Sequence, residues 1–158
     1  MPVVLARIDD RLVHGQVVIG WGRPLAVDLI VLVDAEVAAS DWEQEIYRMA
    51  IPEGMDILFA DSAAAADRLP AWDASQSRVL LLTGTIETMA ELHAAVPEVI
   101  RRVNLGGLHH HPGRSERLPY VYLSDGELDT LRELERTGAV ISAQNLPGTA
   151  PVGLQELG

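Results

Sequence analysis

The chain contains no cysteine and no lysine among its 158 residues. Without cysteine it can form neither disulfides, nor a thiolate nucleophile, nor a thiolate metal site, as expected in a reducing cytoplasm. It also lacks a charged N-terminal stretch followed by a long apolar run, so we expect no signal peptide. No segment approaches the roughly 18 continuous apolar residues of a membrane span. These absences predict a cytoplasmic protein.

All twelve basic residues are arginine, and 23 acidic residues give a net charge of −11. An acidic surface argues against non-specific binding of nucleic acid and against docking on anionic lipid. We therefore expect no nucleic-acid partner. The charge is compatible with a partner that carries a basic patch, or it simply keeps the protein soluble.

Apolar runs alternate with helical patterns along the whole chain, whose length suggests one domain over residues 1–158. This alternation predicts an α/β domain with one mostly parallel sheet and helices on both faces. The predicted strands are 3–9, 28–34, 56–59, 79–82, 102–105, 120–123 and 139–143. The predicted helices are 15–21, 36–50, 62–69, 85–95 and 125–137.

Boundary signals refine these helices. Ser62 is expected to cap the third helix, and Pro70 begins a predicted linker over 70–77. Ser124 and Glu127 form a capping-box pattern at the start of the last helix. Residues 108–119 have no strong periodicity and are expected to form a loop.

Two carboxylates, two guanidiniums and one imidazole lie between the first strand and the first helix, in the stretch 7–17. Open α/β sheets place their chemistry where a strand ends in such a loop. His14 precedes the helix, so its ring is expected near backbone N–H groups that favour an anion. Gly15 lets the backbone come close, and Arg7 and Arg11 offer forked donors suited to phosphate.

These groups fit phosphoryl transfer through a phosphohistidine. A neutral imidazole has one free nitrogen that can attack phosphorus, while Asp9, Asp10 or a backbone carbonyl holds the other nitrogen's proton. The loop supplies positioning and positive charge without a metal, so no cofactor is expected. In the alternative interpretation, His14 is a cap or a surface residue, and the Asp and Arg side chains pair only to fix the loop.

Three consecutive histidines follow at 109–111. His109 and His111 could point the same way in an extended chain, but no third ligand stands at a fixed spacing, so we expect no metal site. Either the segment is an exposed loop, or one of its imidazoles lines the His14 pocket.

The stretch 7–17 resembles the active-site signature of the IIB subunit of the mannose/sorbose/fructose family of bacterial phosphotransferase systems. Weaker similarities at 49–54, 104–107, 123–124 and 146–147 extend the likeness over nearly the whole chain. The resemblance implies a seven-stranded, mostly parallel sheet flanked by helices.

The resemblance also implies a reaction. His14 would accept a phosphoryl group from a histidine of a IIA partner and pass it to a sugar held by membrane subunits IIC and IID. Contact with IIC and IID would place the protein at the inner membrane. The resemblance does not fix the oligomeric state, and a homo-oligomer is one alternative. Arg11 and the loop backbone over 10–16 would hold the phosphoryl group, and Asp10 is our choice, on chemical grounds, for orienting the ring. The further expected phosphate-binding residues are Arg7, Asp9, Gly15, Gln16 and Arg114.

Two segments depart from the family pattern. The histidine-rich stretch 108–114 follows Gly106-Gly107, with Arg114 as its basic residue, and the stretch 143–149 lacks the family's usual arginine. These departures motivate a second hypothesis, a regulatory IIB homologue that signals through phosphorylation or partner binding without sugar transport. A third hypothesis is a small-molecule binder in which His14 takes no part in covalent chemistry.

Overall fold

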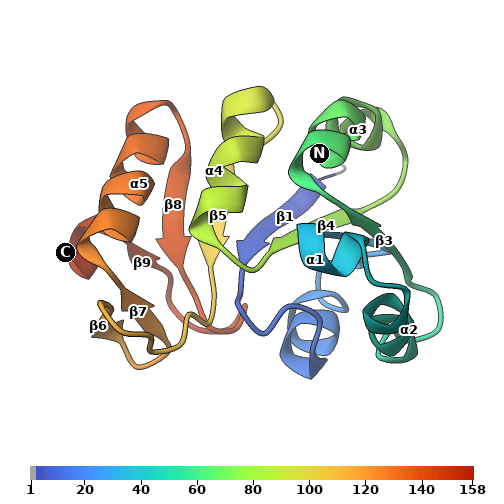
Figure 1. The fold of residues 1–158 in the computed structure, drawn as a ribbon, viewed down its shortest axis with the longest axis horizontal. Helices are drawn as coiled ribbons and strands as arrows, with labels where there is room; N and C mark the ends of the chain where they lie inside the picture. Colours follow the sequence, from blue (N-terminus) through green and yellow to red (C-terminus); the bar gives the residue numbers. More distant parts are fainter. Residues whose placement is uncertain (1–2) are drawn as a thin grey trace.

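The apolar runs of the sequence form the strands of a seven-stranded sheet in the computed structural model, which describes residues 3–158. Its order is β3-β2-β4-β1-β5-β8-β9, and every pairing is parallel except that of β8 with β9. The strands are β1 (Val3–Ile8), β2 (Leu29–Val33), β3 (Asp56–Ala60), β4 (Val79–Thr83), β5 (Arg102–Leu105), β8 (Val140–Ala143) and β9 (Val152–Gly153). β1 thus lies in the interior, between β4 and β5 (Figure 1).

Helices cover both faces of this sheet, which confirms the predicted fold class (Figure 1). One face carries α3 (Ser62–Ala74), α4 (Ile86–Ala95) and α5 (Asp125–Arg136). The other carries the π-helix η1 (Gln16–Trp21) and α2 (Asp41–Met49), which follows the single turn α1 (Ala35–Ala38). The 3₁₀-helix η2 (Leu154–Leu157) comes last. Within residues 3–158, no helix is long and apolar enough to cross a membrane.

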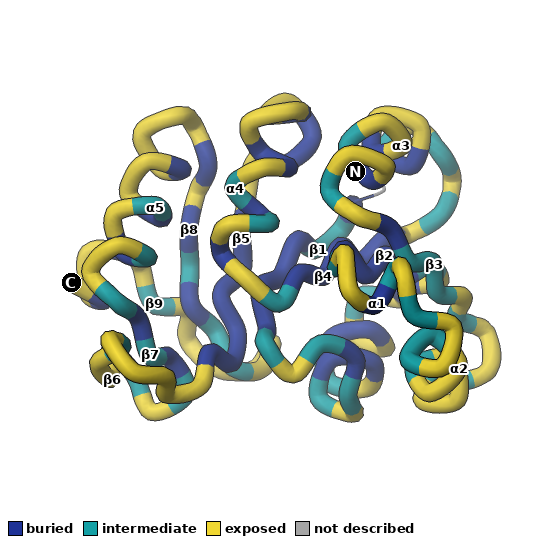
Figure 2. The backbone as a smooth tube through the Cα atoms, in the orientation of Figure 1, coloured by how far each residue is buried: buried dark blue, intermediate teal, exposed yellow. Residues whose placement is uncertain are grey.

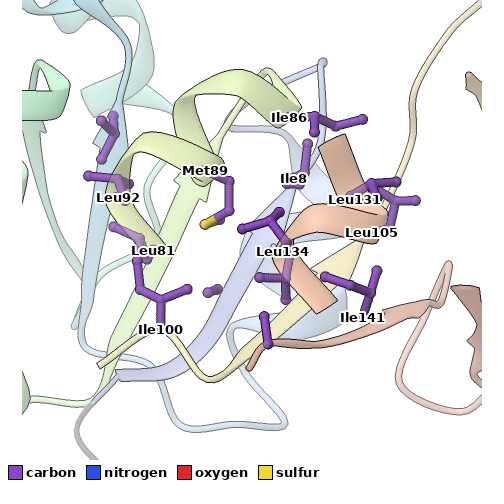
Figure 3. Close-up of a cluster of buried hydrophobic side chains, with 14 of the residues drawn as sticks. Ile8, Leu81, Ile86, Met89, Leu92, Ile100, Leu105, Leu131, Leu134 and Ile141 are labelled. Carbon is purple, nitrogen blue, oxygen red and sulfur yellow. The ribbon is translucent and has the colours of Figure 1, made fainter. Parts of the chain in front are cut away.

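The inner strands are buried on both faces because their side chains alternate between two hydrophobic clusters. Along β2, Val31 and Val33 join the larger cluster, whereas Ile30 and Leu32 join the smaller one. The backbone of these strands is therefore buried beneath helices whose outer surfaces are exposed (Figure 2). Members of the larger cluster shown in Figure 3 are Ile8, Leu81, Ile86, Met89, Leu92, Ile100, Leu105, Leu131, Leu134 and Ile141.

Two helix predictions were wrong at their boundaries. The predicted helix 36–50 is two helices, because the Ser40 hydroxyl accepts a hydrogen bond from the Glu43 amide and starts α2 anew. The cap of α3 is Asp61 rather than Ser62. This helix continues through Pro70 into the predicted linker, because Leu69 and Trp72 are buried on its inner side and outweigh the missing proline N–H.

One strand prediction assigned the wrong partner. Residues 120–123 were expected in the main sheet, but β7 (Val121–Leu123) pairs antiparallel with β6 (Ser115–Leu118) in a separate two-stranded sheet. The predicted loop 108–119 therefore contains a strand. The seventh position of the main sheet is filled instead by β9, from the C-terminal tail. The periodicity of an apolar run indicates a strand but not the strand it pairs with.

Candidate functional site

Three loops meet where the parallel strands end, around the segment that joins β1 to η1. The Asp9 amide donates to the Thr83 carbonyl at the end of β4 (2.9 Å), and the Asp10 amide donates to the Gly107 carbonyl beyond β5 (2.9 Å). The Gln144 amide, just after β8, donates to the Leu105 carbonyl (3.0 Å). The predicted active-site stretch thus lies at the carboxyl edge of the sheet, where ligands of open α/β folds bind.

Asp9 is the buried centre of this edge. Its Oδ2 lies 3.4 Å from His14 Nε2, a buried atom with no hydrogen-bond partner of good geometry among the described residues. Its Oδ1 accepts from the Arg11 amide (3.1 Å) and from Arg11 Nε (3.3 Å), and the Gly107 amide donates to Oδ2 (3.3 Å). The structure therefore places Asp9, rather than Asp10, against the His14 ring.

The pKa of Asp9 lies well below its ordinary value. Burial alone would raise this pKa, but the contacts of the carboxylate with His14 and Arg11 and the charge of Arg7 together outweigh it. Asp9 is therefore an anion at neutral pH, and it faces a ring that can carry a proton.

Arg7 is fully buried and holds the loops together. Its guanidinium donates to the Asn104 side chain, to the Gln144 carbonyl (2.9 Å) and to the Asn145 carbonyl (3.2 Å), and pairs with Asp9 Oδ2 (3.4 Å). Burial lowers the pKa of Arg7 to about 10, against the opposing charge of Asp9, so Arg7 stays a cation at neutral pH. This placement contradicts the expectation that Arg7 binds phosphate.

His14 and Arg11 reach the surface. The His14 side chain is 20% exposed and that of Arg11 39%, beside the Asp9 carboxylate that both contact. Arg11 also donates to the Gln16 side-chain oxygen, and Gln16 in turn donates to Asn145 Oδ1 (3.3 Å). Of the predicted cationic residues, Arg11 is thus the one that presents a guanidinium to solvent next to the imidazole.

The backbone of the active-site loop is strained at Leu12, which has a left-handed φ of 60°. Its side chain packs so closely on Gly84 that a Cβ there would lie 2.7 Å from Leu12 Cδ2. Nothing in the sequence signals this conformation. By contrast, the alternation of side chains at the end of β1 places Arg7 and Asp9 on one side, and that signal could have identified Asp9 as the buried carboxylate.

Asp10 belongs to a second, outer network. Its Oδ2 accepts from the His109 amide (2.7 Å), and its Oδ1 lies 2.5 Å from His109 Nδ1. Arg114 donates to the His109 carbonyl (2.8 Å) and makes a two-pronged pair with Glu127 (2.8 and 2.7 Å). Glu127 also completes the predicted capping box with Ser124. Asp10 is thus engaged away from the His14 ring, and the Arg114 fork is occupied by Glu127 rather than open to phosphate.

The histidine-rich segment lies on the surface, where His109 lines a small hollow. His110 packs edge-on against Tyr122, with ring centroids 5.7 Å apart, and His111 is exposed. Among residues 3–158, no group of three or more His, Asp or Glu side chains is arranged to hold a metal. Six of the residues that line the hollow, of about 260 Å³, are Arg11, Gln16, His109, Tyr120, Tyr122 and Asn145.

We expect Asp9→Asn to lower the free energy of unfolding by about 3–5 kcal/mol, because it leaves the Arg7 cation buried without its anion. Urea denaturation measures the change. Asp10→Asn is the matched control: its His109 partner is 63% exposed, and Arg114, 3.8 Å from Asp10, keeps its pair with Glu127, so we expect a loss of about 1 kcal/mol or less. Equal losses in the two variants would contradict the role assigned to Asp9.

The lowered pKa of Asp9 also makes the stability of the fold depend on pH. Because the pKa of Asp9 is lower in the folded protein, the unfolded chain takes up the proton first as pH falls. The stability due to Asp9 is fully present above its ordinary pKa of 3.8 and is lost as pH falls toward the lower folded value. The difference in free energy of unfolding between wild type and Asp9→Asn should therefore be smaller in acid. Urea denaturation at pH 7 and at pH 3 measures it, and an equal difference at the two pH values would contradict this prediction.

Gly106 offers a test of the buried guanidinium. A Cβ at this position would lie 2.5 Å from Arg7 Cζ, and Arg7 is held by its hydrogen bonds. We expect Gly106→Ala to destabilise the fold by about 1–3 kcal/mol, as overpacking does. Gly148→Ala is the control, because no atom lies within 4 Å of its added Cβ. A thermal melt that leaves both variants unchanged would show that Arg7 can move aside.

Known proteins are similar to this chain over almost its whole length. A family model described as the PTS system sorbose subfamily IIB component matches residues 3–157. The N-acetylgalactosamine-specific phosphotransferase enzyme IIB component 1 of Escherichia coli is 30% identical over 147 residues, covering 92% of both proteins. The crystal structure of that component superposes with a TM-score of 0.87, covering 95% of this chain and 97% of the other.

Two further relatives carry other sugar names. The PTS system sorbose-specific EIIB component of Lacticaseibacillus casei is 29% identical over 140 residues, covering 87% of this chain and 84% of that protein. The mannose-specific EIIAB component of Escherichia coli is 27% identical over 157 residues, covering 99% of this chain but 48% of that protein. Because the family model matches residues 3–157, the chain belongs to the sorbose subfamily of IIB components of the phosphotransferase system.

Proposed function

We propose that His14 carries the phosphoryl group of this IIB component, receiving it from a histidine of a IIA partner and passing it to a sugar hydroxyl. The observation that supports this most is the contact between His14 Nε2 and the buried Asp9 carboxylate at 3.4 Å. If Nε2 holds the ring proton facing Asp9, then Nδ1 is the nitrogen with the lone pair. We therefore assign Nδ1 as the atom that is phosphorylated.

Asp9 makes His14 a better nucleophile in two ways. Its carboxylate fixes the tautomer and the orientation of the ring, as a buried aspartate does for a catalytic histidine. As Nδ1 forms its bond to phosphorus and the donor's N–P bond breaks, positive charge develops on the ring beside the Asp9 anion. The lowered pKa of Asp9 keeps that anion unprotonated during the step.

Arg11 supplies the positive charge that faces the transferred group. Phosphoryl transfer depends mainly on positioning and on charge around the equatorial oxygens, and a guanidinium fork suits those oxygens. Asp9 and the Gln16 side-chain oxygen accept from Arg11 Nε and Nη2, and this leaves Nη1 as the nitrogen that faces a phosphoryl oxygen in the proposed site. We propose that Arg11, together with the loop backbone over 10–16 that includes Gly15 and Gln16, binds the phosphoryl group, with Asp9 acting through the His14 ring.

The proposed partners follow from the family and from one relative. In the mannose-specific EIIAB component, whose name joins IIA and IIB, this chain matches about half of the protein. We propose a separate or fused IIA as the phosphoryl donor, and membrane subunits IIC and IID as the holders of the sugar. Docking on IIC and IID would bring the protein to the inner membrane.

Incubation with a phosphorylated IIA protein should add one phosphoryl group to this chain, on His14. Intact-mass measurement should detect the addition in the wild type and in His111→Ala, whose exposed ring serves as the control, but not in His14→Ala. The bond should be labile in acid and stable in base. An unlabelled wild type, or a His14→Ala variant labelled as well as the wild type, would refute the proposal.

Arg11→Ala should slow phosphorylation by about 100-fold, because a charged donor to the transition state is lost. Arg23→Ala is the control, an exposed arginine beyond η1. Rapid-quench measurement with phosphorylated IIA gives the rate. A rate in Arg11→Ala within twofold of the Arg23→Ala rate would remove Arg11 from the phosphoryl site.

A further inference from the structure

The Asp10–His109 pair is the part of this edge that phosphoryl carriage on His14 leaves unexplained. Asp10 Oδ1 lies 2.5 Å from His109 Nδ1, and Asp10 Oδ2 accepts from the His109 amide at 2.7 Å. A carboxylate that binds Nδ1 fixes the proton there and leaves the lone pair on Nε2. Because the His109 side chain is 63% exposed, this imidazole is both oriented and accessible.

His109 shares one surface hollow with the proposed phosphoryl-binding residue. The hollow of about 260 Å³ is lined by both His109 and Arg11. The amide of Asn145 and the rings of Tyr120 and Tyr122 complete much of its wall. Amides and aromatic rings are groups that can bind the hydroxyls and the faces of a sugar.

The other carboxylates of this edge are poorly suited to accept a proton. Asp9 is buried, its pKa is lowered, and both of its oxygens accept hydrogen bonds. Both Asp10 oxygens are engaged with His109, and both Glu127 oxygens accept from Arg114. Of these groups and His109, the imidazole is the one whose side chain is both largely exposed and held in a defined orientation.

The His109 backbone is also held in place. Arg114 donates to its carbonyl at 2.8 Å and is anchored by Glu127 at the N-terminus of α5. A group that exchanges protons during catalysis must be held at a defined position. The contacts of Arg114 with His109 and Glu127 provide that support from a helix of the scaffold.

We propose that His109 is the general base of the second transfer, from phospho-His14 to the sugar; this rests on the proposed function of His14. As the sugar hydroxyl oxygen forms its bond to phosphorus, His109 Nε2 takes the hydroxyl proton. The bond between phosphorus and His14 Nδ1 breaks, and its electron pair returns to the His14 ring. The imidazolium formed at His109 is stabilised by Asp10 and then releases its proton to water.

The His109→Asn variant separates the proposed role of His109 as a base from its structural role as a partner of Asp10. The asparagine amide can still donate to Asp10 from the position of Nδ1, but it has no counterpart of Nε2, whereas His109→Ala loses both. The two half-reactions are measured separately on the full chain. The first is phosphorylation by phosphorylated IIA, and the second is transfer from the isolated phosphoprotein to sugar in membranes that carry IIC and IID.

N-acetylgalactosamine, sorbose, fructose and mannose are tried in turn, and the sugar that the wild type phosphorylates is used for every variant. Relative to its rate of phosphorylation by IIA, transfer to sugar should fall by about 100-fold in both His109→Asn and His109→Ala, the lower range for loss of a general base. His111→Asn, an exposed histidine of the same segment, should keep the wild-type ratio.

The outcomes distinguish this inference from the proposed function. A wild type that acquires no phosphoryl group on His14, or transfers to none of the four sugars, overturns both. If His14 is labelled normally and His109→Asn keeps the wild-type ratio of sugar transfer to phosphorylation, only the role of His109 as general base is overturned. If that ratio is low in His109→Ala alone, His109 serves only to hold Asp10. A low ratio in both variants supports the assignment.

Discussion

The ion pair between Arg7 and Asp9 is the contact on which the whole carboxyl edge depends. Both side chains are fully buried, and burying two charges is unfavourable unless their remaining donors and acceptors are satisfied. Here loops after two other strands supply most of the partners: Arg7 donates to the carbonyls of Gln144 and Asn145, and Asp9 accepts from the Gly107 amide, while Arg7 Nε has no hydrogen-bond partner among the described residues. A charge pair at the end of β1 therefore fixes the loops after β5 and β8.

Two adjacent aspartates of the site contact different imidazoles. Asp9 points inward, where Arg7 and Arg11 keep it ionised against the His14 ring. Asp10 points outward and binds His109 from the segment after β5. One imidazole is thus aligned from the buried side and another from the solvent side by consecutive residues. In the proposed mechanism, each half of the two-step phosphoryl transfer then has its own carboxylate.

Much of this could be predicted from the sequence, but only where the cause is local. The stretch 7–17 contains its own strand end, loop and helix start, so the position of His14 at a sheet edge follows from the order of residues. The inward burial of Arg7 does not, because it depends on Asn104 and on carbonyls more than 130 residues away. The alternation of side chains at the end of β1 favours Asp9 as the buried carboxylate, but the binding of Asp10 by His109 depends on a residue 99 positions away.

In the fold, too, local features could be predicted from the sequence and long-range pairings could not. The capping box of Ser124 and Glu127, which lie three positions apart, was predicted correctly. The pairing of β7 with β6, and the entry of β9 into the main sheet, depend on which strands come together in space. Periodicity in one segment carries no information about that choice.

The two-residue strand β9 bears on how the molecule avoids self-association. A parallel sheet that ended at β8 would expose a row of unpaired amides and carbonyls, which is a template for another chain's strand. The tail pairs antiparallel with Ser142 and Ala143, the C-terminal half of β8, and its brevity leaves little edge of its own to be extended. The last few residues of the chain thereby shorten the sheet edge that a strand of another chain could extend.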